Sequence, residues 1–419
     1  MMAKQGNSTA VPRLRFPEFS GAEEWIFTPL GSLAILKNGY PFKSSTYAPG
    51  NFRIVTIANV QSGQLFLEDA NSIARLPADI QDHQILQPGD ILISMTGNVG
   101  RVCLVDSPDL LLNQRVGKLV PYACDLRFFY QALQREEFRK SMQLRAAGGA
   151  QGNLSVSDIT ELLISTPPDV REQKKIADCL TSLDEVIAAQ GRIVAALKKY
   201  KRGLMQQLFP REGETRPRLR FPEFRDAPEW KKLPLCDLGE IVTGKTPSTT
   251  DAERWGGDVL FITPTDISEN NKYQRSSQRT VVATPKLKVL PAGSITYTCI
   301  ASIGKMAITV RPSITNQQIN SVVTLPTISN EFVYYALANL TPWIKSIPAS
   351  STLAIINKKD FSGIDIWIPV DSSEQKVVAD CLSSLDTQIA AETDQLAALK
   401  THKQGLMQQL FPTPEVASA

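Results

Sequence analysis

Two long stretches of this chain carry apolar residues at alternating intervals of four and three positions. This spacing is typical of a coiled-coil seam, and it predicts two long helices. Each stretch ends in Leu-Phe-Pro, at Pro210 and Pro412, where proline prevents the helix from continuing. The first apolar seam residues, which we expect to pair the helices, are Ile176, Leu180, Leu183, Ile187, Val378, Leu382, Leu385 and Ile389.

Polar residues interrupt both seams at matching places, Gln190 with Glu392 and Lys201 with Lys403. Such residues cost stability but can fix the register and orientation of a pair. Residues 171–210 hold eight Lys/Arg against four Asp/Glu, whereas residues 373–412 hold three against five. These opposite balances favour pairing of the two helices with each other, antiparallel within one chain. Dimerisation of the whole protein through the helices is the alternative.

The chain contains an internal repeat. The helical stretch ending at Pro210 returns with an offset of 202 residues, and the box RLRFPEF occurs at 13–19 and again at 218–224. Each box is followed by a tryptophan, Trp25 or Trp230, and then by a segment of alternating Val, Ile and Thr bounded by Gly and Pro. These runs predict strands and turns, while the patterns at 127–144 and 331–347 indicate short helices.

The predicted fold class is therefore α+β, with two pseudo-repeated mixed domains separated by two long helices that pair as an antiparallel coiled coil. We expect domain 1 at residues 1–170 and domain 2 at 213–372. The helices between and after them are expected at 171–212 and 373–412, and a flexible tail at 413–419.

Composition excludes several classes of protein. The net charge of +3 permits a nucleic-acid partner without arguing for one, because a basic footprint must be concentrated on one face. No apolar run is long enough to span a bilayer, and the first residues lack the apolar core of a secretory signal. Six scattered cysteines and two histidines argue for reduced thiols in the cytoplasm and against a metal site.

Two glycine turns are the clearest candidate contacts in the globular segments. Gly100 and Gly304 are each followed at once by a cation, Arg101 and Lys305, which could approach a phosphate or a base edge closely. A solvent-exposed turn residue is an equally good reading. The pairs Asn113-Gln114 and Asn316-Gln317 could contact adenine, but Asn and Gln cap turns at least as often.

One motif is rejected. Residues 239–246 match the P-loop pattern by letter, but Pro247 follows at once and disfavours the helix that a phosphate cradle requires after its Lys-Thr pair. No S-adenosylmethionine loop, methyltransferase box, nuclease signature or helicase signature is visible.

The segment GGAQGNLSVSDITELLISTPPDVREQKKIADCLTSLDEVI resembles the domain-closing segment of specificity subunits of type I restriction-modification enzymes. In that family, a Glu-Gln pair leads into a long spacer helix; Glu172-Gln173 and Glu374-Gln375 occupy this place here. The box RLRFPEF with its following tryptophan is similar to the opening of the family's target-recognition domains. The resemblance covers nearly the whole chain, in the expected order and twice.

The resemblance implies a non-catalytic, sequence-specific DNA-binding subunit. Each domain would read one half of a bipartite, gapped, asymmetric site, and the helices would set the spacing. The implied partners are double-stranded DNA, two methylation subunits and possibly two restriction subunits. S-adenosylmethionine would belong to the methylation subunit, and no cofactor or metal to this chain. Docking of the partners is expected at Glu172, Gln173, Glu374 and Gln375.

Charge and loop placement select ten candidate DNA contacts: Lys37, Lys43, Asn98, Arg101, Arg115, Lys245, Arg275, Lys305, Gln318 and Lys358. A coiled-coil adaptor that joins two proteins without binding DNA is the main alternative. An adaptor would explain the helices, but it would not explain why the chain has two β-rich segments that share landmarks and differ in sequence. A self-contained modification enzyme would need a cofactor pocket and a catalytic motif, and the sequence shows neither.

Overall fold

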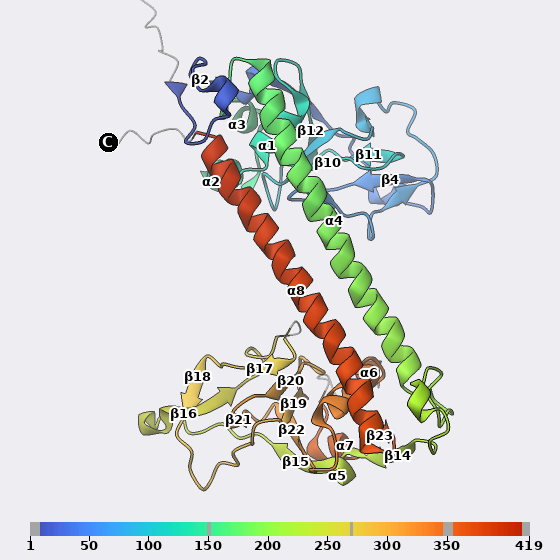
Figure 1. The fold of residues 1–419 in the computed structure, drawn as a ribbon. Coiled ribbons are helices and arrows are strands. Elements are labelled where there is room, and N and C mark those ends of the chain that lie inside the picture. Colours follow the sequence, from blue (N-terminus) through green and yellow to red (C-terminus); the bar gives the residue numbers. More distant parts are fainter. Residues whose placement is uncertain (1–8, 149–151, 269–270, 347–354, 413–419) are drawn as a thin grey trace, which may run out of the picture. The chain divides into compact units, whose positions relative to one another are not determined.

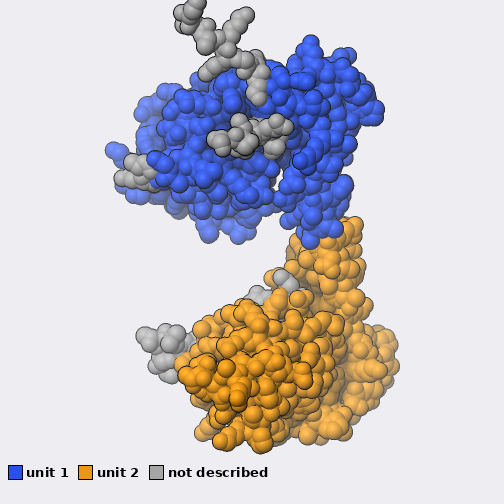
Figure 2. Space-filling view, turned by 90° about the vertical axis from the view of Figure 1, so that its left-hand side faces the viewer, with its two compact units in different colours: residues 1–189, 396–419 blue, residues 190–395 orange. Residues whose placement is uncertain are grey.

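The computed structural model describes residues 9–148, 152–268, 271–346 and 355–412. They form two compact units, one of residues 1–189 and 396–419 and the other of residues 190–395 (Figure 2). Each unit contains one mixed α/β domain and one half of each long helix. The predicted boundaries between domains and helices stay a prediction, because this division runs through both helices; the predicted tail at 413–419 lies outside the described residues.

The two long helices are α4 (Val170–Leu208) and α8 (Ser372–Leu410), each of 39 residues (Figure 1). Both end at the leucine of Leu-Phe-Pro, two residues before the proline, since α geometry is disfavoured in the residue that precedes a proline. Within unit 1 the start of α4 packs beside the end of α8, and within unit 2 the end of α4 packs beside the start of α8. The helices therefore pair antiparallel, as the sequence predicts.

The domain in unit 1 is built on short sheets and three short helices. The sheets, in strand order, are β1-β2-β13 (Thr9–Ala10, Trp25–Pro29, Leu163–Thr166), β10-β9-β12-β3 (Val102–Leu104, Ile91–Ser94, Val116–Pro121, Ala34–Asn38), β7-β4-β11-β8 (Ser72–Ile73, Phe52–Val55, Leu110–Leu112, Ile85–Leu86) and β5-β6 (Val60–Gln61, Gln64–Leu65). The helices are α1 (Leu126–Leu133), α2 (Glu136–Gly148) and α3 (Val156–Thr160).

The domain in unit 2 has the same kinds of element. Its sheets are β14-β23 (Lys231–Pro234, Asp365–Ile368), β15-β22-β19-β20-β17 (Gly239–Thr243, Ile319–Thr324, Ile295–Thr298, Met306–Thr309, Tyr273–Gln274) and β18-β16-β21 (Arg279–Val281, Trp255–Ile262, Ser313–Thr315). Its helices are α5 (Leu235–Leu238), α6 (Asn330–Ser346) and α7 (Lys358–Ser362). The α+β class is confirmed, with helix α6 where a short helix was expected.

The tryptophan after each box packs against the end of a long helix. Trp25 makes an edge contact with Phe411 at 5.8 Å between ring centroids, and Trp230 does the same with Phe209 at 6.0 Å. These phenylalanines belong to the two Leu-Phe-Pro motifs. Both tryptophans lie in the core of their unit, so the repeated box and the repeated helix end form one hydrophobic cluster in each half.

Each box also caps a helix end through its backbone. The amide of Leu14 donates to the carbonyl of Gln409, and the amide of Leu219 donates to the carbonyl of Gln207, both at 3.0 Å. Carbonyls in the last turn of a helix lack partners within the helix, so these bonds satisfy them. The first box thus closes on the last helix as the second box closes on the first helix.

Candidate nucleic-acid interface

The two glycine turns have the same construction in both domains. Gly100 and Gly304 have φ values of +75° and +89°, in the left-handed region that favours glycine. A Cβ at Gly100 would lie 2.6 Å from Cβ of Met142 on α2, and one at Gly304 would lie 2.4 Å from Cγ2 of Thr341 on α6. Each turn is therefore held close to the helix beneath it, and each requires glycine.

A hydroxyl at the end of the preceding strand fixes each turn. Ser94 Oγ donates to the carbonyl of Asn98 at 2.6 Å and accepts from the amide of Arg101 at 3.0 Å. Thr298 Oγ1 likewise donates to the carbonyl of Ser302 and accepts from the amide of Lys305 at 2.9 Å. Sequence reasoning missed these hydroxyls; their equal place before the two turns is the signal that could have found them.

The two asparagines of the Asn-Gln pairs act as turn caps. The Asn113 side chain accepts from the amide of Arg115 at 3.3 Å, and that of Asn316 accepts from the amide of Gln318 at 3.1 Å. Both asparagines are 9% exposed. Because their oxygens bind backbone amides within the same loop, the turn-capping alternative is the one that the structure supports for both.

In domain 1, the predicted contacts gather at one end of the sheet β10-β9-β12-β3. There β9 ends before Asn98, β10 begins after Arg101, β12 begins after Arg115 and β3 ends one residue after Lys37. The amide of Met95 donates to the carbonyl of Arg115 at 3.1 Å and joins two of these loops. Arg101 also donates to the side chain of Gln61. Lys43 is exposed in the loop beyond β3.

In domain 2, four of the five predicted contacts gather at the equivalent end of the five-stranded sheet. Lys245 follows β15, Lys305 precedes β20 and Gln318 precedes β22. Lys358 begins α7 beside them, since the amide of Ile356 donates to the carbonyl of Cys299 at 2.9 Å. Arg275 is the exception: it follows β17, which runs parallel to β20, and therefore lies at the other end of the sheet.

Most of these cations have no acidic partner. Among the described residues, none of Lys37, Arg115, Lys245, Lys305 and Lys358 forms an ion pair. Unpaired cations in loops at the end of a sheet can contact phosphates, which carry most of the affinity of a protein for DNA. The prediction that these residues contact DNA stays untested by the fold.

The Glu-Gln pairs are buried at the start of the two long helices. Glu172 accepts two hydrogen bonds from the guanidinium of Arg15, at 2.8 and 2.7 Å, and one from the indole of Trp25 at 3.2 Å. Glu374 accepts the same set from Arg220, at 2.7 Å for both bonds, and from Trp230 at 3.1 Å. The bond to Glu172 raises the pKa of Arg15. Each box is thereby locked to its helix.

The glutamines satisfy backbone groups in the same places. Gln173 accepts from the amide of Asp125 at 2.8 Å and donates to the carbonyl of Pro167 at 2.9 Å. Gln375 accepts from the amide of Ser329 at 3.0 Å and donates to the carbonyl of Pro369 at 3.3 Å. All four residues of the two pairs are at most 2% exposed. Docking of a partner on them stays a prediction, and their burial means that a partner would meet the residues around them.

The predicted helix-pairing residues are most buried near the domains. Ile176 and Leu180 lie in the core of unit 1 and Val378 and Leu382 in that of unit 2. The remaining four, half-buried along the seam, are Leu183, Ile187, Leu385 and Ile389. The seam lysines bridge the helices: Lys403 Nζ lies 2.6 Å from Asp184, and Lys201 Nζ lies 2.5 Å from Asp386.

The described part of the chain also bears on nucleotide-binding, metal and membrane-spanning sites. The first five residues of the P-loop-like segment form strand β15, and no helix begins at Lys245 or Thr246. No group of His, Cys, Asp and Glu among the described residues could hold a metal ion. None of the described helices is both long and apolar enough to cross a membrane.

Comparison with known proteins matches this architecture twice along the chain. The type I restriction modification DNA specificity domain matches residues 22–201 and again residues 228–401. The specificity subunit of the type I restriction enzyme HindI from Haemophilus influenzae is 37% identical over 33% of this chain, and the match spans 32% of its own length. The putative MjaX specificity subunit of Methanocaldococcus jannaschii is 23% identical, over 93% of both proteins.

Solved structures show the same fold. The S subunit of a type I restriction-modification system from M. genitalium superposes with a TM-score of 0.61 at 19% identity, over 96% of this chain and 100% of that one. A chain from a structure describing complex assembly and conformational transition of the type I R-M system superposes with a TM-score of 0.53 at 18% identity, over 92% and 97%. Since the two family matches together cover most of the sequence, the chain belongs to the family of type I restriction-modification specificity subunits.

Proposed function

We propose that this chain is the DNA-reading subunit of a type I restriction-modification complex. Each domain reads one half of a bipartite, gapped and asymmetric DNA site, and the paired helices set the distance between the halves. A helix of 39 residues is about 58 Å long, which suffices to separate two readers by about one turn of duplex, ~34–36 Å. The two domains differ in sequence, so the two half-sites differ as well.

One observation carries this proposal: in each domain, unpaired cations on turns of equal construction gather at the equivalent end of a sheet. Turns built on Ser94 and Thr298 present Arg101 and Lys305 from the same position. Two similar domains on one chain suit a ligand that presents similar surfaces at two places. Duplex DNA does this, because its phosphate backbone is the same at both half-sites. Neighbouring side chains differ between the domains, as reading two sequences requires.

The chain itself supplies recognition and no chemistry. Two methylation subunits, which would carry S-adenosylmethionine and modify adenine, would dock along the helices and around the buried Glu-Gln pairs. Two restriction subunits could then join the complex. S-adenosylmethionine would bind the methylation subunits, and this chain would hold none.

Detection of methylated adenine across the genome, with and without an intact copy of the gene, tests this function. We expect loss of one gapped, two-part motif on deletion and its return on complementation. A complementing chain in which only residues 20–168 come from a relative should change one half of the motif and keep the other. Persistence of every methylated motif, together with salt-independent or absent DNA binding by the purified chain, would leave the adaptor as the better function.

A further inference from the structure

A polar cavity of about 810 Å³ lies in unit 2, between the second domain and the two long helices. Its walls are residues 266, 268 and 271–276 around β17, Lys198 and Lys201 on α4, and several residues between 383 and 394 on α8. Arg275, the candidate contact that lies apart from the other four in its domain, is on this wall. The cavity therefore gives Arg275 different neighbours from those of the turn at Gly304.

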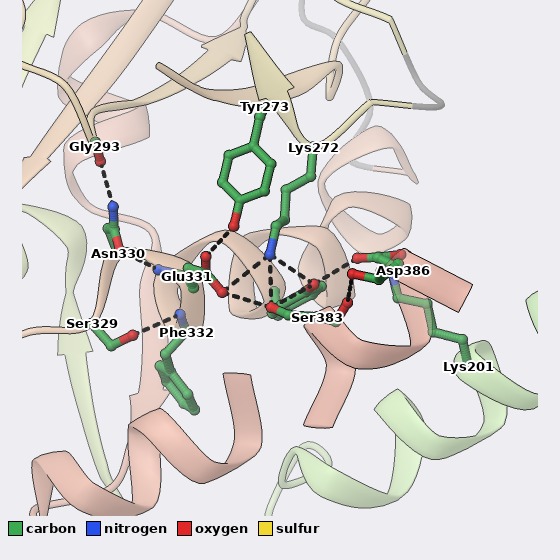
Figure 3. Close-up of polar contacts among 12 residues, drawn as sticks. Lys201, Lys272, Tyr273, Gly293, Ser329, Asn330, Glu331, Phe332, Ser383 and Asp386 are labelled. Carbon is green, nitrogen blue, oxygen red and sulfur yellow. Dashed lines mark hydrogen bonds and ion pairs between the residues drawn. The ribbon is translucent and has the colours of Figure 1, made fainter. Parts of the chain in front are cut away.

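The floor of the cavity is a fixed hydrogen-bond network (Figure 3). Lys272, whose side chain is 7% exposed, donates to Glu331 at 3.1 Å, to Ser383 at 2.7 Å and to the hydroxyl of Tyr335 at 3.3 Å. Its three N–H groups are thereby used. The network joins β17 and α6 of the domain to α8, so the floor holds the wall that carries Arg275 against the helices.

Two of the three carboxylates that line the cavity are already engaged. Asp386 accepts from Lys201 at 2.5 Å and from Tyr335 at 2.6 Å. Asp266 accepts from the amides of Thr263 at 2.9 Å and Gln278 at 2.7 Å. Asp394 is exposed at the rim. Lys201 therefore balances the charge of Asp386, whereas neutral amides hold Asp266 in place and leave its charge unbalanced.

The cations of the rim are not balanced in this way. Lys198 and Arg275 are exposed, and neither forms an ion pair within the described part of the chain. The Arg275 guanidinium lies over the ring of Tyr273, 5.9 Å from its centroid, and the Tyr273 hydroxyl donates to Glu331. Arg275 is thus supported by the floor network. Lys199 and Arg202, also exposed, extend the positive charge along α4.

We propose that this cavity binds the phosphate backbone of duplex DNA in the unread segment beside the half-site of the second domain. The proposal rests on the function proposed above. Lys198 lies on α4 and not in the second domain, so a phosphate that it contacts would lie beside the bases which that domain reads. Cations without an acidic partner, with the amide of Asn271 and the hydroxyl of Ser276 in the same lining, suit phosphate oxygens.

Unit 1 lacks the same cluster at the equivalent helix positions. With the offset of 202 residues, Lys198, Lys199 and Arg202 correspond to Lys400, Thr401 and Gln404 on α8. Two of the three cations are therefore missing there. We expect the contact with unread DNA to be made beside one half-site only.

The test compares the variant K198Q/R275Q with the matched control K286Q/K376Q, which removes two exposed, unpaired cations of the same unit. Binding of the purified chain to the cognate duplex and to one with both half-sites scrambled is measured across salt concentration. We expect the slope of log affinity against log salt to fall by about two for K198Q/R275Q on both duplexes. The control should keep the wild-type slope. An unchanged slope for K198Q/R275Q, with an unchanged unfolding temperature, would overturn the proposal.

Neutral methylphosphonate linkages locate the contact. Placed in the unread segment beside the second half-site, they should abolish the difference between wild type and K198Q/R275Q, and placed outside the site they should preserve it. The reverse pattern would also overturn the proposal. If the wild-type chain bound its cognate duplex no more tightly than the scrambled one, the reading function would be refuted instead. The two failures can be told apart, because the salt slope reports phosphate contacts on any sequence.

Discussion

Gln190 donates its side-chain amide to both the carbonyl, at 3.0 Å, and the carboxylate of Glu392, and these two residues occupy the same position in the two copies of the repeat. The helices thus meet at equivalent residues, and the pair is complementary because one copy carries an amide and the other an acid. A single polar pair in a seam fixes register, since any slip would leave both groups without partners.

Replacing this amide by an acid should weaken the pairing. In Q190E two carboxylates would face each other, and we expect a loss of about 1–3 kcal/mol at pH 7. Like charges raise the pKa of one member of such a pair, so the loss should shrink as the pH falls toward 5. Thermal unfolding at both values measures this. The matched variant E392Q keeps a neutral pair and should stay close to wild type; equal losses in both variants would contradict the assignment.

The bidentate arginines should be needed for the stability of each unit. Arg15→Met leaves Glu172 charged, buried and without its main partner, and we expect a loss of about 3–5 kcal/mol. Arg15→Lys should recover only part of this, because lysine cannot form two parallel bonds. The equivalent variants at Arg220 should behave alike. Thermal unfolding checks the series, with the exposed Arg13→Lys as control; a loss below about 1 kcal/mol in Arg15→Met would show that the pair is dispensable.

The turn cations should contribute to DNA affinity without setting sequence preference, if they contact phosphate. We expect R101A and K305A each to weaken binding equally on cognate and scrambled duplexes, and to lower the salt slope by about one. A contact to a base edge would instead reduce discrimination at one half-site by about 1–3 kcal/mol. Anisotropy titrations across salt separate the two cases. Unchanged binding in both variants would remove these turns from the interface.

Acid should loosen the floor network of the second domain. Burial raises the pKa of Glu331, but hydrogen bonds from Ser383, Tyr273 and Lys272 outweigh it and hold that pKa below its ordinary value. The ionised form is therefore favoured in the folded state. Its contribution is present above the ordinary glutamate pKa of about 4.3 and is lost as the pH falls from that value through the lower pKa of the folded state.

The variant E331Q tests this dependence. Between about pH 5 and pH 3, the unfolding temperature of wild type should fall more steeply than that of E331Q, which has no proton to bind. The exposed Glu253→Gln is the control and should follow wild type. Parallel curves for wild type and E331Q would show that Glu331 does not couple folding to protons.

Thiol reactivity should follow burial. Cys236 is exposed, whereas burial raises the pKa of Cys103 to about 12 and that of Cys299 to about 11. Because the thiolate is the reactive form, we expect a maleimide at pH 7.5 to label Cys236 rapidly and the other two only after denaturation. Mass spectrometry of digested protein measures the order. Labelling of Cys103 in the native chain as fast as that of Cys236 would contradict the packing of β10.

Much of the architecture could be predicted from the sequence because it is periodic or repeated. The four-three spacing indicated the long helices, and Leu-Phe-Pro indicated their ends, since both follow from local backbone rules. The same interruptions, Gln190 with Glu392 and Lys201 with Lys403, marked the residues that bridge the helices. The sequence also showed that Arg15, Trp25 and Glu172 recur as Arg220, Trp230 and Glu374. It did not show that each set forms a buried hydrogen-bonded group.

Only the tertiary structure decided which residues are neighbours. It separated Arg275 from Lys305, because β17 runs parallel to β20, and it placed Arg275 in the lining of one cavity with Lys198, more than seventy residues away in sequence. It also showed that the Glu-Gln pairs, expected at a docking surface, are buried, and that the two asparagines bind backbone amides of their own turns. Periodicity and motifs report the backbone of one element, whereas burial and hydrogen-bond partners depend on strand order and on which helix covers which sheet. Those long-range contacts leave no regular spacing in the sequence.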